Sequence, residues 1–332
     1  MATPNHDITL VEAVTLAHRR AMEEDPSVLV MGEDVGINGG VFRATDGLLD
    51  IFGKDRVMDT PLAETTIAGA AIGLATQGFR PVAEIQFMGF IYPTLDHMVN
   101  HAGRLRNRTR GRLTCPMVLR APYGGGIHAP EHHSESVESF FVHAPGLRVV
   151  IPSTPQRAYG LLLAAIRDPD PVVFLEPKRI YRTGKEAVQD NGEALPLDRC
   201  FVEREGEHIT LISWGAMMLE TRKAADDLEA NGVSTEVIDV ACLSPLDSKT
   251  ILNSVRKTGR AVIIQEAPQQ VGVGAEIAAL LVEHALYDLI APPQRVCGYD
   301  TVMPLPALEK HYMPDKARIV SAARHALSFG QN

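Results

Sequence analysis

The chain has 332 residues, of which 45% are hydrophobic and 22% are charged, and its formal net charge at pH 7 is −9. These values are typical of a globular protein with room for two domains, and the negative charge argues against a nucleic-acid or anionic-membrane partner. The four cysteines (Cys115, Cys200, Cys242 and Cys297) lack Cys-x-x-Cys spacing, which predicts reduced thiols in a cytoplasmic protein. No signal peptide is recognisable, and no apolar run approaches the length of a membrane span.

The first half of the chain alternates predicted helices with apolar strands. Thr9 and Glu12 have the spacing of a capping box at the start of the first helix, and a helix of small residues follows over 63–76. Ser153 or Thr154, followed by Pro155, opens another helix. Apolar strands that alternate with helices predict a parallel sheet covered on both faces. The predicted strands are 28–31, 81–87, 117–120, 147–151 and 171–175, with further helices around 92–106 and 134–142.

The segment from Glu176 to Cys200 interrupts this pattern. It is charged, contains Gly184 and Gly192, and shows no sustained periodicity, so we interpret it as an interdomain connection. The alternation then resumes, with a helix that ends at a glycine cap, Gly232. We therefore predict two α/β domains, 1–185 and 200–332, joined by a linker over 186–199. The later strands are expected at 209–213, 235–240 and 261–264, and the later helices from 247, over 274–289 and over 315–327.

The glycine-rich stretches do not carry phosphate-binding motifs. Residues 32–36, 124–126 and 272–274 do not form Gly-x-Gly-x-x-Gly at the start of a helix, and no Walker lysine motif occurs. A Rossmann dehydrogenase is therefore a poor fit. We expect these glycines to let the backbone bend or approach a ligand or another chain closely.

Glu64 stands at the entrance to the small-residue helix, where the following residues offer its carboxylate no local partner. An ionised carboxylate in apolar surroundings is costly, so Glu64 is expected to be neutral, exposed or bound to another group. The alternative is an ordinary first-turn carboxylate that the helix dipole stabilises.

Three histidines, His128, His132 and His133, lie in a predicted loop between a strand and a helix. Loops after the carboxyl ends of parallel strands are where such sheets place their active sites. A metal site formed by His128, Glu131 and His132 is one alternative, but Pro130 breaks the helix that would align the two histidines. We favour a catalytic or substrate-orienting histidine, because imidazole titrates near neutral pH.

Two other clusters receive a structural interpretation. His97 and His101 stand four residues apart on a predicted helix, but no third ligand is evident, so we interpret them as packing or surface residues. Five arginines at positions 104, 106, 108, 110 and 112 have no aromatic residues between them, which predicts a solvated loop or a subunit contact.

Several long segments occur in an order that points to one family. They are residues 31–36, 39–48, 56–64, 78–87, 145–153, 170–178 and 257–260. With these segments the chain resembles the β subunit of the thiamine-diphosphate-dependent decarboxylating component of 2-oxo acid dehydrogenase complexes, from Thr9 to the C-terminal helix. The resemblance implies a transketolase-like pyrimidine-binding domain followed by a transketolase C-terminal α/β domain, within an α2β2 heterotetramer.

The same resemblance assigns cofactor-binding residues. It implies that Glu64 hydrogen-bonds N1′ of the aminopyrimidine and so helps the thiazolium ring to lose a proton. Phe90 is expected to pack on the pyrimidine ring. Leu62 and Gln86 are further residues expected to bind the cofactor.

Two more catalytic residues follow from the resemblance. Glu33 is expected in an acidic relay between paired active sites. His133 is expected to orient the substrate and to act in reductive transfer to lipoamide, although the adjacent His132 could compete for this role.

The resemblance also implies metals and partners. The magnesium and diphosphate motif, Gly-Asp-Gly followed by Asn, does not occur in the chain, so an α subunit is expected to bring Mg²⁺ and the diphosphate end of the cofactor. The C-terminal domain is expected to dock the peripheral-subunit-binding domain of the dihydrolipoyl acyltransferase. A structural potassium ion is expected at Met117, Ala165, Ile166, Asp168 and Asp170, mostly through backbone carbonyls.

The predicted function is oxidative decarboxylation of pyruvate with reductive acyl transfer to lipoamide. Branched-chain 2-oxo acids are the alternative substrates, because residues 176–181 also occur in branched-chain members, whereas Pro130 and Glu131 resemble pyruvate-specific ones. Two alternative functions belong to different classes. One is a standalone metal-dependent hydrolase that uses the histidine loop, and the other is a non-catalytic scaffold that assembles a complex.

Overall fold

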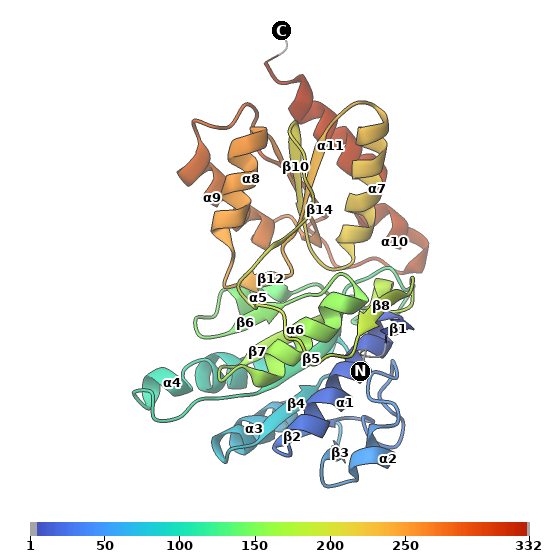
Figure 1. The fold of residues 1–332 in the computed structure, drawn as a ribbon, viewed down its shortest axis with the longest axis vertical. Helices are drawn as coiled ribbons and strands as arrows, with labels where there is room; N and C mark the ends of the chain where they lie inside the picture. Colours follow the sequence, from blue (N-terminus) through green and yellow to red (C-terminus); the bar gives the residue numbers. More distant parts are fainter. Residues whose placement is uncertain (1–4, 331–332) are drawn as a thin grey trace. The chain divides into compact units, whose positions relative to one another are not determined.

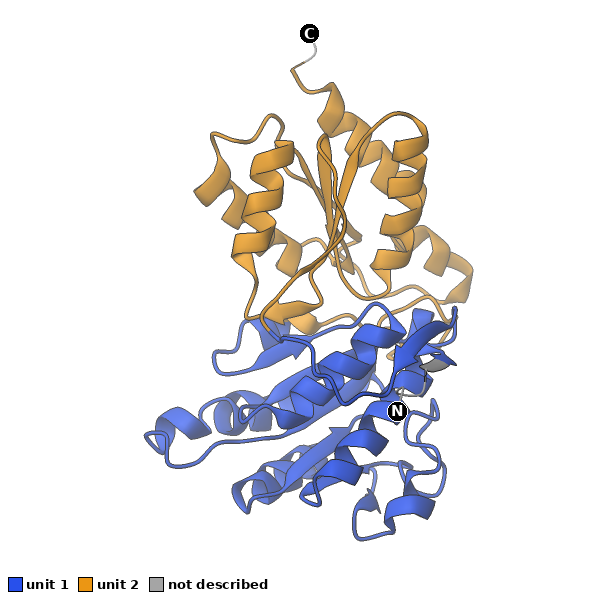
Figure 2. Ribbon diagram, viewed as in Figure 1, with its two compact units in different colours: residues 1–123, 140–197 blue, residues 124–139, 198–332 orange. Residues whose placement is uncertain are grey.

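The computed structural model describes residues 5–330. The chain divides into two compact units, and Figure 2 draws them in different colours. Unit 1 comprises residues 1–123 and 140–197, and unit 2 comprises residues 124–139 and 198–332. The chain therefore leaves unit 1 after residue 123 and returns to it at residue 140.

Unit 1 contains a parallel sheet, in which its strands follow the order β6-β7-β5-β4-β2-β3 (Figure 1). The parallel register aligns Gly32, Glu84 and Arg120 on neighbouring strands. All residues of β2, β5 and β7 are buried, as expected for a parallel sheet covered on both faces. The strands are β2 (Val28–Gly32), β3 (Val57–Asp59), β4 (Arg80–Glu84), β5 (Val118–Tyr123), β6 (Arg148–Val150) and β7 (Val172–Pro177).

Two helices of unit 1, α1 and α6, begin where the sequence predicted. Thr9 and Glu12 form the capping box at the start of α1, and Thr154 caps α6 with Pro155 at the first helical position. Helix α1 packs against α6, whereas α3 packs against η2 and η3. The helices are α1 (Leu10–Glu24), α2 (Leu48–Phe52), α3 (Glu64–Thr76), η1 (Met88–Phe90), η2 (Tyr92–Thr94), the π-helix η3 (His97–Ala102), α4 (Leu105–Arg108), α6 (Pro155–Arg167) and η4 (Lys178–Ile180), while α5 (Glu138–Val142) starts in the segment assigned to unit 2.

Two local predictions were wrong. The helix expected over 92–106 is divided into η2, η3 and α4, and the chain crosses another segment at Gly103, where a side chain on Gly146 would collide with the Gly103 carbonyl. The helix expected over 134–142 begins only at Glu138. In addition, β1 (Asn5–Ile8) and β8 (Glu186–Gln189) form an antiparallel pair that the sequence did not reveal.

Unit 2 contains a second sheet, with the strand order β14-β13-β10-β11-β9. All its pairings are parallel except that of β9 with β11. Helix α7 packs against α11, and α8 packs against α9. The elements are β9 (Phe201–Arg204), β10 (Ile209–Ser213), α7 (Met217–Ala230), β11 (Thr235–Asp239), β12 (Cys242–Ser244), α8 (Ser248–Thr258), β13 (Ala261–Pro268), α9 (Val273–Ala285), β14 (Gln294–Gly298), α10 (Pro306–Tyr312) and α11 (Lys316–Ser328).

Further sequence predictions are confirmed here. Gly232 follows α7 with a positive φ of 79°, as expected of a glycine that ends a helix. The four cysteines are free thiols, and burial raises the pKa of Cys115 to about 12. Within residues 5–330, no helix has both the length and the apolar character needed to cross a membrane.

Candidate active site

Two predicted catalytic carboxylates lie at the carboxyl ends of the strands in unit 1. Glu33 directly follows β2, and Glu64 begins α3 after the turn that follows β3. Burial, together with the negative charges of Asp34 and Glu64, raises the pKa of Glu33. The fold therefore brings Glu33 and Glu64, which are far apart in sequence, into electrostatic range of each other.

Glu64 occupies an unusual position at the start of its helix. The preceding residue, Ala63, provides no side-chain cap, so the helix starts without the hydrogen bond that Ser, Thr or Asp would accept. Among residues 5–330, the Glu64 carboxylate has no hydrogen-bond or ion-pair partner, and it is half-buried. A carboxylate placed in this way remains available to an external donor.

Helix α3 itself explains how a second molecule could approach this carboxylate. Every residue from Ile67 to Ala75 is Ala, Gly, Ile or Leu, yet Ala70 and Gly73 are exposed. A helix that is apolar on all sides is normally buried on all sides. Ala70 and Gly73 therefore leave apolar surface exposed on the helix that Glu64 begins, which suits contact with another chain.

The predicted cofactor-binding residues surround the same strand ends. The Gln86 side-chain amide donates to Asp34 Oδ2 at 3.2 Å, which connects the loops after β4 and β2. Phe90, in η1, packs edge-on against Phe87 with ring centroids 5.7 Å apart. Leu62 is 73% exposed. The region thus combines a carboxylate, an amide and partly exposed apolar groups on one edge of the sheet.

The start of α3 is also held against the segment that carries Phe90. The Thr65 hydroxyl donates to the Pro93 carbonyl at 3.5 Å, and α3 packs along η2. Glu64 and the chain that follows Phe90 therefore belong to one packed substructure.

A buried charge network supports these strand ends, and sequence reasoning missed it. Arg120 is fully buried, and its Nε and Nη2 donate to Glu176 at 2.5 and 2.7 Å. Its Nη1 contacts Glu84, and the Tyr181 hydroxyl donates to Glu176 at 2.5 Å. The network joins β4, β5 and β7, the central strands whose ends carry Gln86 and the loops around it. Only the tertiary register brings these residues together.

His133 lies on the loop that belongs to unit 2. Its Nδ1 is 2.8 Å from the Glu131 carbonyl oxygen, which can only accept, so the Nδ1–H group donates to it and orients the ring. His133 is half-buried, whereas His132 is exposed and has a positive φ of 64°. The hydrogen bond and the partial burial therefore orient the His133 side chain.

Two buried carboxylates that the sequence did not single out hold this loop within unit 2. Glu309 accepts the backbone N–H groups of Gly126 at 2.6 Å and His128 at 3.1 Å. Glu266 accepts the N–H of Gly125 at 3.2 Å and the Ser136 hydroxyl at 2.6 Å. Successive backbone N–H groups that converge on an anion stabilise its buried charge. The loop conformation is therefore fixed on both sides of the predicted histidines.

The alternative metal site on this loop finds no support. His128 and His132 both have positive φ values, so they do not lie on one helical face. The one cluster of metal-ligating side chains in the described part of the chain lies elsewhere, at Asp96, His97 and His101.

The residues assigned to potassium lie near one another in unit 1. Ala165 and Ile166 occupy the last turn of α6, and Asp168 and Asp170 follow it. Arg80 Nη1 donates to the carbonyls of Ile166 at 3.0 Å and Asp168 at 3.2 Å. The carboxylates of Asp168 and Asp170 pair with Arg148 and Arg106, and the Met117 carbonyl accepts the Val172 N–H. A potassium ion at this position would share two carbonyls with a guanidinium group.

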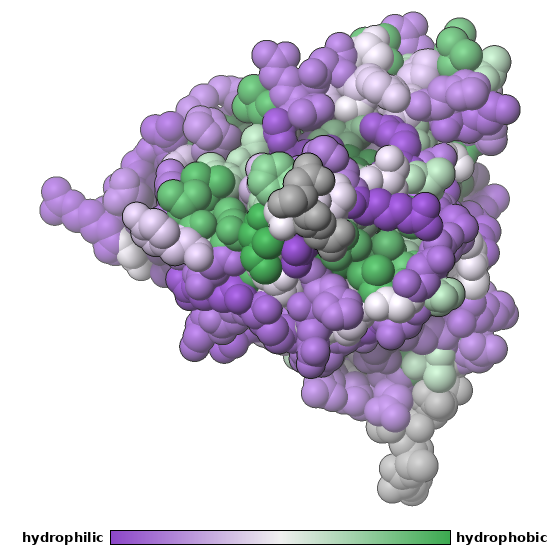
Figure 3. Space-filling view, turned by 90° about the horizontal axis from the view of Figure 1, so that it is seen from above, coloured by the Kyte–Doolittle hydropathy of each residue, from purple (hydrophilic) through white to green (hydrophobic). Residues whose placement is uncertain are grey.

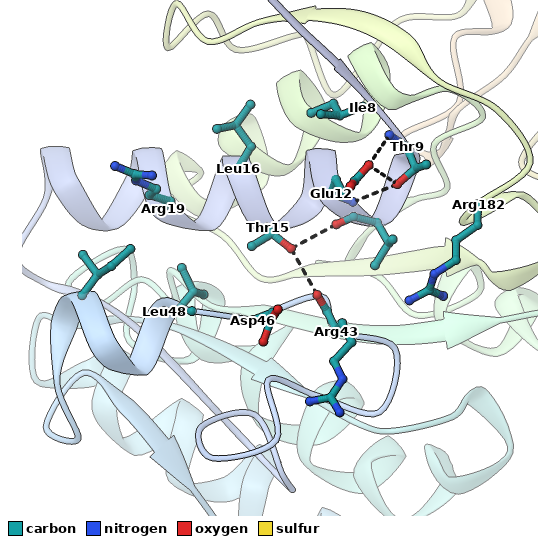
Figure 4. Close-up of a pocket in the computed structure, with 13 residues that line it drawn as sticks. Ile8, Thr9, Glu12, Thr15, Leu16, Arg19, Arg43, Asp46, Leu48 and Arg182 are labelled. Atoms are coloured by element: carbon teal, nitrogen blue, oxygen red, sulfur yellow. Dashed lines mark hydrogen bonds between the residues drawn. The ribbon is translucent and has the colours of Figure 1, made fainter.

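Unit 1 also contains a cavity of about 690 Å³ that includes none of the predicted site residues (Figure 4). Helices α1 and α2 line it together with Arg43 and Arg182. The Thr15 hydroxyl donates to the Ala44 carbonyl at 3.0 Å, which fixes the wall formed by residues 43–48. This hollow is thus distinct from the carboxylate site.

The arrangement of two α/β units agrees with family comparisons. The family described as "Transketolase, pyrimidine binding domain" matches residues 6–184, and "Transketolase, C-terminal domain" matches residues 198–319. A solved structure described as "Split gene transketolase, inactive beta4 tetramer" is similar to the whole fold, with a TM-score of 0.76, 24% identity, and coverage of 98% of this chain and 99% of that chain. The predicted transketolase-like fold class is confirmed.

Closer relatives identify the family. "Pyruvate dehydrogenase E1 component subunit beta" of Acholeplasma laidlawii is 50% identical over 317 residues, which cover 96% of this chain and 97% of that protein. The protein of the same name from Bacillus subtilis (strain 168) is 48% identical over 322 residues, which cover 97% and 99%. The chain belongs to the family of pyruvate dehydrogenase E1 component β subunits.

Proposed function

We propose that this chain is the β subunit of a thiamine-diphosphate-dependent enzyme that oxidatively decarboxylates pyruvate and transfers the acyl group to lipoamide. The relatives that cover nearly the full chain carry the name of the pyruvate enzyme, which favours pyruvate over branched-chain 2-oxo acids. The structural observation that carries the proposal is the Glu64 carboxylate, which is half-buried and has no hydrogen-bond or ion-pair partner among residues 5–330. Together with burial, its charge also helps to raise the pKa of Glu33.

The residues at this edge fit the pyrimidine end of the cofactor. When bound, thiamine diphosphate supplies a carbon nucleophile and an electron sink for decarboxylation. The Glu64 carboxyl group shares a proton with a nitrogen of the pyrimidine ring. Phe90 offers a ring surface on which the pyrimidine can pack, and Leu62 covers an apolar part of the ligand. Water can reach this site because Leu62 is exposed and Glu64 is only half-buried. A second chain that covers the site would exclude this water, which would strengthen the hydrogen bond of the carboxylate.

The second chain in this proposal is an α subunit, which binds Mg²⁺ and the diphosphate in an α2β2 assembly. The absence of the Gly-Asp-Gly…Asn motif from the sequence supports this division of labour. The apolar face of α3, with Ala70 and Gly73 exposed, is the surface that we expect the partner to cover. His133 orients the substrate and acts in reductive transfer to lipoamide, and Glu33 belongs to an acidic relay between the paired active sites.

The remaining predicted ligands and partners belong to this proposal. The predicted potassium ion would bind at Met117, Ala165, Ile166, Asp168 and Asp170, where it would share the Ile166 and Asp168 carbonyls with Arg80. The free cysteines, three of them buried, support a reducing, cytoplasmic location.

Unit 2 is proposed to dock the peripheral-subunit-binding domain of the acyltransferase. Figure 3 shows hydrophobic residues gathered in patches on the face seen from above. In unit 2, the end of α9 and the residues after it carry four exposed apolar side chains, and Tyr287 is fully exposed. They are Val282, Leu286, Tyr287 and Ile290. Exposed apolar clusters of this kind favour a protein partner.

The decisive experiment replaces Glu64 with Gln and assays the enzyme reconstituted with its α subunit. We expect turnover to fall by about 10²–10⁴-fold, because a neutral amide cannot exchange a proton with the cofactor. Asp50→Asn is the matched control, since Asp50 is an exposed acid in the first turn of α2. Unchanged turnover in Glu64→Gln would favour a non-catalytic scaffold.

Substrate choice needs a separate assay. The reconstituted enzyme should turn over pyruvate with a higher kcat/KM than 2-oxoisovalerate, because differential binding in the transition state sets specificity. A preference for 2-oxoisovalerate would show that the enzyme acts on branched-chain 2-oxo acids, and the proposed role of Glu64 would be unaffected.

A further inference from the structure

A second cluster of chemically active side chains lies on the surface of unit 1. Asp96, His97 and His101 each offer one ligand atom, and these three atoms lie within 4.8 Å of one another. Asp96 and His101 are exposed, and His97 is half-buried. The sequence shows the two histidines four residues apart, and Asp96 is the residue immediately before η3.

The local backbone explains why these side chains converge. Residues His97–Ala102 form a π-helix, and the Gly103 N–H bonds the Met98 carbonyl, five residues earlier. The imidazole rings of His97 and His101 have centroids 5.8 Å apart and are inclined by 38°. π-helical turns are rare and occur frequently at functional sites.

Packing against α3 restricts the His97 ring. A Cβ atom on Gly69 would lie 3.4 Å from His97 Cε1, so the imidazole lies directly over this glycine. On the other side, Asn100 Nδ2 donates to Asp96 Oδ1 at 2.7 Å and holds that carboxylate beside the helix. Two of the three ligands are therefore partly oriented by neighbouring groups, which is how metal sites are commonly supported.

We propose that Asp96, His97 and His101 bind a divalent d-block cation of the Zn²⁺ type. Two imidazoles and one carboxylate are donors that Zn²⁺ accepts at about 2.0–2.2 Å, with a fourth position left for water. Tetrahedral ligand atoms are then roughly 3.3 Å apart, so rotamer changes of the exposed Asp96 and His101 are enough to close the site.

Arg108 is the natural competitor of the cation. Its Nη1 lies 3.5 Å from His101 Nδ1, and its Nη2 donates to the Asn100 carbonyl at 2.8 Å. Its positive charge disfavours a second cation nearby, and its removal should tighten metal binding. This response distinguishes the proposed site from adsorption of metal by scattered surface histidines.

The test is isothermal titration of the metal-free full chain with ZnCl₂. We expect one saturable site, a loss of affinity of at least roughly tenfold in His97→Gln/His101→Gln, and a smaller loss in Asp96→Asn. Arg108→Gln should tighten binding by roughly threefold to tenfold, because it removes the repulsion between the guanidinium group and the metal cation. Thermal unfolding in EDTA should be the same for wild type and these variants, which excludes misfolding as the cause.

Two controls decide against competing explanations. His284→Gln/His325→Gln removes two exposed histidines from α9 and α11 and should leave the titration unchanged. His128→Gln/His132→Gln tests the loop of unit 2 and should also leave it unchanged. The proposal is overturned if the wild-type chain shows no saturable binding, or if the loop variant, rather than His97→Gln/His101→Gln, abolishes it. Because binding is measured without the α subunit or cofactor, the result is independent of the proposed enzymatic function.

Discussion

Arg120→Gln is the substitution with the largest expected effect on stability. The Arg120 guanidinium lies between Glu84 of β4 and Glu176 of β7, and all three side chains are almost completely buried. Burial is the main cause that raises the pKa of Glu84, and Arg120 acts in the opposite direction. The variant would leave two carboxylates next to each other, without a cation, in the interior of the sheet.

The magnitude follows from this arrangement. Removal of one partner from a buried ion pair typically costs about 3–5 kcal/mol, a large part of the roughly 5–15 kcal/mol that stabilises a folded domain. The direction in which stability changes with pH follows from the raised pKa of Glu84 in the folded state. Such a group contributes its full stability below the unfolded pKa of about 4.3, and this contribution is lost as pH rises through the folded pKa. Arg120→Gln raises that pKa further, so its destabilisation should grow with pH.

Urea unfolding of the full chain at pH 6.5 and 8.5 measures the loss of stability and its dependence on pH. Both pH values lie above the pI of about 5.7 that the sequence gives. Glu84→Gln in the Arg120→Gln background should recover part of the lost stability, because it removes one unpaired charge. Arg106→Gln is the control, since it removes an exposed arginine that pairs with Asp170. Equal stability of Arg120→Gln and wild type, or a larger loss at pH 6.5 than at pH 8.5, would refute the reasoning.

Other substitutions test the loop, a cap and the cation site. Gly124→Ala should destabilise the chain by about 1–3 kcal/mol in urea unfolding, because Gly124 has φ 81° and a Cβ would collide with Glu266. Glu309→Gln should speed hydrogen exchange in residues 124–139, and unchanged exchange would argue against the anchoring role. Thr154→Ala should cost about 1 kcal/mol through loss of the α6 cap. Exchange of NaCl for KCl should raise the thermal midpoint if potassium binds near Arg80, and identical midpoints would count against that site.

Features encoded by neighbouring residues could be predicted from the sequence. The capping box at Thr9 and Glu12, the cap at Thr154 and the glycine after α7 each depend on residues within a few positions of one another. The alternation of helices and apolar strands was sufficient to predict parallel sheets, because a strand buried on both faces must be apolar at almost every position.

Features that depend on distant segments could not be predicted in this way. Glu309 lies 181 residues from His128, whose backbone N–H it accepts, and an isolated acid near a chain end gives no sign of such a role. The pairing of β1 with β8 joins the two ends of unit 1, across short strands with little apolar character. The grouping of Asp96 with His97 and His101 could not be predicted either, because the sequence predicts an α-helix where the structure has a π-helix.

The position of Glu64 links the fold to the need for a partner. Its helix is apolar from Ile67 to Ala75, but packing on the sheet and on η2 and η3 buries only part of that surface. If α3 served only the core of unit 1, polar residues would be expected at exposed positions such as Ala70 and Gly73. An alanine and a glycine at these positions instead suit a closely packed subunit contact, and a partner that extends to the start of α3 would also remove water from Glu64. One surface would thus hold the subunits together and complete the active site, so catalysis should depend on assembly.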